Sequence, residues 1–154
     1  MKPGFLILWA ILFHYGCESS TDSLLLSHGE EVLTPLVLEN YMSFKLNDTL
    51  TLAFSDTLCN SDENIWVTFD SLMTDSRCPM NVVCFWEGNA QVLILFSDNE
   101  YIHKIKLNTY HGFVSETDVL SYNISLVDVL PYPHTDSLYV EEDYRVHIVV
   151  KSLP

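Results

Sequence analysis

The fold of this chain is decided by the stretch Asp75-Ser76-Arg77-Cys78-Pro79, followed after four residues by Cys84-Phe85-Trp86-Glu87-Gly88-Asn89-Ala90. Its two cysteines lie six positions apart, Pro79 stiffens the start of the segment between them, and Gly88 follows shortly after. The segments on both sides, 65–73 and 90–96, are apolar enough to be core strands. A short cystine loop would fix both strand ends at one point, so we predict a disulfide between Cys78 and Cys84, worth about 2 kcal/mol on the chain-entropy model.

The other residues of this motif are expected to be structural. Asp75 or Ser76 is expected to accept backbone N–H groups in a turn, and Arg77 to pair with a nearby acid. We expect Trp86 to pack in the core against the sulfur pair. The alternatives are a small polar site at the strand end and an exposed Trp86 that anchors a ligand.

Alternation of apolar and polar residues predicts strands along the rest of the chain. Seven are expected, at 41–46, 49–54, 65–73, 90–96, 101–107, 122–130 and 144–150. Asn47-Asp48 predicts that the first two form a hairpin. The run 90–96 is apolar on both parities, which favours a strand covered on both faces. A change of parity at Asp128 predicts a bulge, and Pro131-Tyr132-Pro133 ends that strand.

Seven short strands in one domain predict an all-β fold. We expect a single antiparallel β-sandwich, immunoglobulin-like in size, over residues 39–154, with a closed barrel as the second choice.

The N-terminus predicts export. Phe5 to Phe13 is a run of nine apolar residues, too short to span a bilayer but long enough for a signal peptide. Gly16-Cys17 and the polar residues after it resemble a bacterial lipoprotein signal, which predicts a signal peptide at 1–16, lipidation of Cys17 and a flexible tether at 17–38. His14 and Tyr15 depart from that pattern, so ordinary cleavage and secretion is the alternative.

The four cysteines are Cys17, Cys59, Cys78 and Cys84. Disulfides persist in exported proteins, so their pairing is meaningful. If Cys17 is acylated, Cys59 is expected to be a free, buried thiol. Without lipidation the four cysteines could pair in any of three ways.

The net charge of the chain limits the kinds of molecule it is expected to bind. The chain has 21 acidic and 7 basic residues, a net charge of −14. Such a field repels phosphate backbones, so we expect no nucleic-acid partner. It also repels an anionic membrane surface, so membrane attachment is expected only through the N-terminal lipid anchor.

The central motif resembles the signature of a family of small uncharacterised bacterial lipoproteins, Asp-Ser-Arg-Cys-Pro followed by Cys-x-Trp-x-Gly-x-Ala. The resemblance spans roughly Phe44 to Val150 and includes Val129-Leu130-Pro131-Tyr132-Pro133 and Asp143-Tyr144-Arg145-Val146. It does not include Cys59, and it brings no activity with it.

Motifs of catalysis are not seen in the sequence. Five residues separate Cys78 from Cys84, unlike redox dithiols, and the histidines show no metal-ligand spacing. We find no nucleophile elbow and no phosphate loop, and we expect no cofactor.

The leading hypothesis is therefore a non-enzymatic cell-envelope lipoprotein that offers a loop surface to a protein or glycan. The alternative is a secreted protease-inhibitor-like sandwich acting through the loops Ser55–Asn64 or Asn108–Val119. A hydrolase with an unrecognised site is a third.

Overall fold

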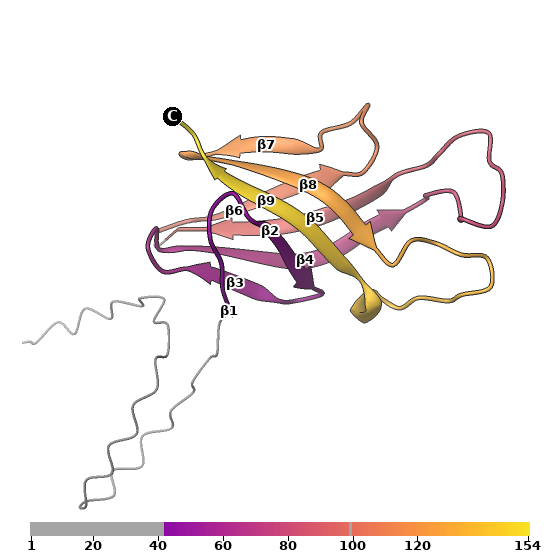
Figure 1. The fold of residues 1–154 in the computed structure, drawn as a ribbon, viewed down its shortest axis with the longest axis horizontal. Helices are drawn as coiled ribbons and strands as arrows, with labels where there is room; N and C mark the ends of the chain where they lie inside the picture. The colour runs from indigo at the N-terminus through magenta and orange to yellow at the C-terminus, as the bar shows by residue number, and fades with distance from the viewer. Residues whose placement is uncertain (1–41, 99) are drawn as a thin grey trace, which may run out of the picture.

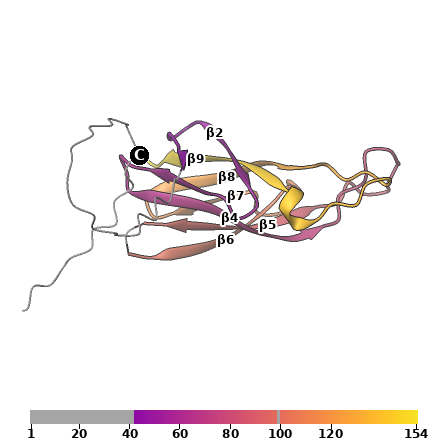
Figure 2. The ribbon, with the colours of Figure 1, turned by 90° about the horizontal axis from the view of Figure 1, so that it is seen from below.

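The computed structural model describes residues 42–98 and 100–154, which form two β-sheets packed face to face (Figure 1, Figure 2). The expected all-β sandwich is confirmed. The predicted signal peptide, the tether and Cys17 lie outside the described residues.

The described residues contain more strands than the seven predicted. They are β1 (Met42–Ser43), β2 (Thr49–Ala53), β3 (Thr57–Asn60), β4 (Ile65–Asp75), β5 (Ala90–Ser97), β6 (Ile102–Asn108), β7 (Glu116–Val119), β8 (Tyr122–Leu130) and β9 (Arg145–Ser152). A single 3-10 turn, η1 (Glu141–Asp143), precedes β9. The strands β3 and β7 lie in segments that we predicted as loops, because both are short and largely polar.

The five-stranded sheet has the order β1-β3-β4-β5-β6, and the four-stranded sheet has the order β2-β9-β8-β7. All neighbouring strands are antiparallel except β1 and β3, which are parallel. The hairpin predicted at 41–54 is wrong. The turn at Asn47-Asp48 exists, since Asp48 N–H donates to the Lys45 carbonyl at 3.4 Å, but β1 and β2 on either side of it belong to different sheets.

The core fills the space between the sheets. Phe69 and Phe96 face inward from the five-stranded sheet, and Leu52, Val146 and Ile148 meet them from the other. Each is fully buried, which stabilises the fold by about 1.5–3 kcal/mol per side chain. The inward alternation predicted for the last strand is confirmed. The prediction for 90–96 is wrong on one face, because the outward residues of β5 are only half-buried.

A bulge interrupts β8 where the parity change predicted one. The β8–β9 register shifts between Leu126 and Asp128, so Val127 is exposed while Val129 is fully buried. The strand ends at Leu130, which is joined to Pro131 by a cis peptide bond.

Three connections gather at one end of the sandwich. The pairing of β4 with β5 ends at Asp75 and Ala90, so residues 76–89 extend beyond the sheets, next to the β8–β9 connection (Figure 1, Figure 2). The β6–β7 connection reaches the same place through Thr109, whose N–H donates to the Ala90 carbonyl at 3.0 Å. We call this region the loop end.

Candidate functional site

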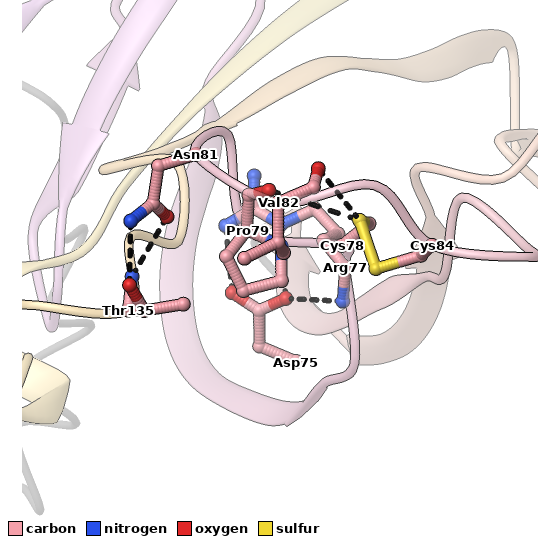
Figure 3. The surroundings of a disulfide bond; sticks show 8 residues. All are labelled: Asp75, Arg77, Cys78, Pro79, Asn81, Val82, Cys84 and Thr135. Atoms are coloured by element: carbon pink, nitrogen blue, oxygen red, sulfur yellow. Dashed lines mark hydrogen bonds and ion pairs between the residues drawn. A yellow bond between two sulfur atoms is a disulfide. The ribbon is translucent and has the colours of Figure 1, made fainter.

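A buried ion pair ties two of these connections together. Arg77 is 5% exposed, and its guanidinium donates to both carboxylate oxygens of Asp75, at 2.7 and 2.9 Å (Figure 3). It also donates to the carbonyls of Val129 and Pro131 and lies over the Tyr132 ring, 4.8 Å from its centroid. We call the Asp75–Arg77 pair and these three residues the clasp. Its satisfied hydrogen bonds are what make a buried charge tolerable.

Asp75 affects a neighbouring tyrosine as well. The Tyr144 hydroxyl lies 3.4 Å from the Asp75 carboxylate. Burial, and then the negative charge of Asp75, raise the pKa of Tyr144 above its usual value. The prediction that Asp75 binds backbone in a turn is confirmed too, since it accepts the Arg77 N–H at 3.1 Å.

Beyond the clasp the two halves of the 76–89 connection stay paired. Ser76 N–H donates to the Asn89 carbonyl, and Cys78 N–H to the Glu87 carbonyl, both at 2.8 Å. Gly88 makes this close approach possible. Its φ is +79°, and a Cβ there would lie 2.0 Å from the Ser76 carbonyl oxygen, so no other residue fits.

The predicted disulfide between Cys78 and Cys84 is present, with its Cα atoms 5.9 Å apart. The loop it closes is also fastened to the β8–β9 connection. Met80 N–H donates to the Pro133 carbonyl at 2.9 Å, and Asn81 and Thr135 exchange two hydrogen bonds (Figure 3). Pro79 begins a turn in which its carbonyl accepts the Val82 N–H.

The outer surface of this fastened loop is apolar. Val83 and Phe85 are fully exposed, and three further apolar residues beside them are partly so. We call the set the apolar tip: Met80, Val82, Val83, Phe85 and Trp86. The prediction that Trp86 packs in the core is wrong. Its side chain is 47% exposed, and its ring meets the edge of Tyr110 at 4.9 Å.

An open pocket of about 550 Å³ lies near the apolar tip, at the ends of β4, β5 and β6. Thr74, Gln91 and Asn108 line it in register, one from each strand. The β6–β7 connection supplies the other wall through residues 112–114, and Phe113 stands 53% exposed at its rim. Asn108 itself is buried and hydrogen-bonded on both sides of its amide.

The structure brings Cys78 and Cys84 together as predicted, and it identifies Asp75 as the acid with which Arg77 pairs. Gln91, Asn108 and Phe113 were not singled out in the sequence, because only the strand register places them side by side. Of the two loops proposed for an inhibitor, Asn108–Val119 contributes Phe113 to the loop end, but it also contains β7. Ser55–Asn64 contains β3.

The prediction that Cys59 is a free thiol is wrong. Cys59 is fully buried, as expected, but it is disulfide-bonded and not a free thiol.

Within residues 42–98 and 100–154, no group of three or more His, Cys, Asp or Glu side chains is placed to hold a metal ion. None of the helices in that part of the chain is long and apolar enough to cross a membrane. Comparison with protein-family models, with curated proteins and with solved structures finds no match for this chain.

Proposed function

We propose that the protein is an exported, non-enzymatic binding module that holds another extracytoplasmic protein through its apolar tip. The observation behind this proposal is the exposure of Val83 and Phe85 on a loop fixed by a disulfide, the clasp and the bonds to Pro133 and Thr135. Exposed apolar patches mark interaction sites on soluble proteins. A loop that is already ordered loses little conformational entropy on binding, so its apolar area converts into affinity.

Charge favours a protein partner over a membrane. The chain carries a net charge of −14, and Glu87 lies directly after the apolar tip. An anionic lipid surface repels such a molecule, whereas an apolar cleft with a basic rim attracts it. We therefore expect the partner to offer an apolar cleft surrounded by Lys or Arg.

Protease inhibition is the second candidate, because a rigid apolar loop is suited to filling a protease cleft. The loop would be residues 78–86 and not either of the two loops predicted from the sequence. The lining of the nearby pocket contains no Asp, Glu, His or Lys side chain, which supports a binding role over acid–base hydrolysis.

Export is supported by the Cys78–Cys84 disulfide, since such bonds persist outside the cytosol. Cys17 itself lies outside the described residues. We propose lipid anchoring at Cys17, because Gly16-Cys17 and the polar residues after it resemble a lipoprotein signal, with secretion of the cleaved chain as the alternative.

Detergent phase partitioning with intact mass spectrometry tests whether the exported protein carries a lipid anchor. The lipoprotein is expected to enter the detergent phase, to begin with acylated Cys17, and to move to the aqueous phase on Cys17→Ala substitution. A wild-type protein that stays in the aqueous phase without an acyl mass would select the secreted form.

Site-specific photocrosslinking in the exporting cell tests whether the apolar tip contacts a protein partner. We place benzoylphenylalanine at Phe85 and, as a control, at the exposed Ile102, which lies at the other end of β6. A discrete protein adduct at Phe85, absent at Ile102 and lost on Val83→Ser substitution, is expected. The same adducts at both positions, or lipid adducts alone, would overturn the proposal. An adduct identified as a protease, with inhibition measured against the purified enzyme, would select the second candidate.

A further inference from the structure

The pocket beside the apolar tip has a polar lining, which suggests a second binding site, separate from the protein-binding surface proposed above. It has an open volume of about 550 Å³, within the size range of ligand sites. Thr74, Gln91 and Asn108 form a polar row across three neighbouring strands, since Gln91 pairs with Thr74 on one side and Asn108 on the other.

This polar row is held in place before any ligand arrives. The buried amide of Asn108 accepts from Gln91 at 3.1 Å and from Asn89 at 2.9 Å, and it donates to the Val114 carbonyl at 3.0 Å. Asn89 in turn accepts the Tyr110 N–H at 3.0 Å. The network fixes the strand ends to the β6–β7 connection, so the ligand-binding groups are preorganised.

The network leaves hydrogen-bonding capacity unused on residues that line the pocket. Each amide nitrogen has two protons, and the bonds described use one on Gln91 and one on Asn108. The Gln91 carbonyl oxygen and the Thr74 hydroxyl add acceptor capacity. The pocket therefore presents donors and acceptors together, and its lining contains no charged side chain.

An aromatic ring completes the site. Phe113 lines the pocket and is half exposed, and it is supported by Tyr110, with ring centroids 5.2 Å apart, and by its N–H bond to the Tyr110 carbonyl. Gly112 allows this arrangement, because a Cβ there would lie 2.4 Å from the Tyr110 ring.

We propose that this pocket binds a neutral sugar. Sugar hydroxyls both donate and accept hydrogen bonds, which matches the amides of Gln91 and Asn108 and the hydroxyl of Thr74. The apolar C–H face of a pyranose ring packs against an aromatic ring such as Phe113. The net charge of −14 and the absence of a charged residue from the lining disfavour sugar acids and phosphates, since no cation in the lining offsets the repulsion between the protein and an anion.

A nuclear magnetic resonance titration of the full exported chain tests this assignment. The probes are glucose, galactose, N-acetylglucosamine and its β-1,4-linked dimer, with glucuronate and a blocked dipeptide for comparison. Saturable amide shifts at 89–91, 108 and 112–114 are expected with at least one neutral sugar. Gln91→Ala and Phe113→Ala should each weaken that binding about tenfold.

Phe85→Ala is the matched control, because it removes the same side chain from the apolar tip, where the ring is fully exposed. It should leave sugar affinity unchanged, and Phe113→Ala should leave crosslinking from the apolar tip unchanged, so the two proposals fail separately. Absence of saturable shifts with every neutral sugar overturns the inference. So does stronger binding of glucuronate or of the dipeptide, or binding that Gln91→Ala and Phe113→Ala do not weaken.

Discussion

The guanidinium of Arg77 lies where three parts of the chain meet. It joins Asp75, at the end of β4, to the carbonyls of Val129 and Pro131 around the end of β8. A buried charge of this kind is stable only while all its partners remain. The sequence predicted that Arg77 pairs with a nearby acid, without identifying Asp75 as that acid, whereas the carbonyl partners 52 and 54 residues away could not be predicted.

We expect Arg77→Ala to lower the free energy of unfolding by about 3–5 kcal/mol, because it leaves the Asp75 carboxylate buried without its cation. Urea unfolding followed by tryptophan fluorescence measures the loss. Arg145→Ala, at an exposed arginine, is the control and should change the same quantity by less than about 0.5 kcal/mol. Equal losses in the two variants would show that the clasp does not hold the fold.

Gly88→Ala is expected to be more damaging than Gly112→Ala. At Gly88 the positive φ and the backbone of Ser76 both oppose a Cβ, at a cost above about 2 kcal/mol. At Gly112 the obstacle is the Tyr110 ring, which can rotate. Thermal unfolding of the two variants compares them. A larger loss at Gly112 would contradict the close backbone approach.

Stability should fall at alkaline pH partly through Tyr144. Burial raises the pKa of Tyr144 in the folded protein, so the unfolded chain releases its proton first, near pH 10. The contribution of Tyr144 is therefore complete below about pH 10 and is lost as the pH rises through its folded pKa. The loss of stability between neutral and strongly alkaline pH should be smaller in Tyr144→Phe, as measured by urea unfolding. An identical pH dependence would contradict this.

Among the elements, the strands with strict apolar alternation were predicted well. The first half of β4, from Ile65 to Phe69, and β9 have buried residues at every second position, which is the signal that the sequence shows directly. β7 was missed because its four residues are mostly polar and none is buried, and β3 because three consecutive buried residues in a four-residue strand show no alternation. The pairing of β2 with β9 was missed for another reason: a turn signal fixes where the chain bends but not which strand it joins.

The β4–β5 connection should survive reduction of its disulfide. The closed loop is short, and the clasp and the bonds to Pro133 and Thr135 remain, so we expect a loss of about 1–3 kcal/mol without loss of the fold. Urea unfolding of the Cys78→Ala/Cys84→Ala variant measures this loss in the free energy of unfolding. Peptide mapping without reductant should recover Cys78 linked to Cys84, with Cys59 protected from alkylation. A freely alkylated Cys59 would contradict the second disulfide.

Across the whole molecule, the features that suggest function lie at one end. The clasp, the apolar tip and the pocket share the connections between β4 and β5, β6 and β7, and β8 and β9. The fold class and the importance of the Cys78–Cys84 stretch could be predicted from sequence. The exposure of Phe85 could not, because an apolar residue beside a cysteine is equally typical of a core.

Val83→Ser/Phe85→Ser should therefore leave the fold unchanged while abolishing partner binding. Both side chains are fully exposed, so the free energy of unfolding should change by less than about 0.5 kcal/mol. Urea unfolding tests this alongside the crosslinking experiment. Ile102→Ser is the matched control, and a large loss of stability in the double variant alone would mean that these residues pack in the core.

The Cys78–Cys84 bond also links the two ends of an exposed segment in which a protease can cut the backbone. Residues 79–83 are largely exposed, so the chain can be cut there. Such a cut does not separate the two fragments, because the disulfide keeps them in one covalent molecule. The hydrogen bonds of Met80 and Asn81 keep the N-terminal half of the loop in position. A nicked molecule would run as one band without reductant and as two with it.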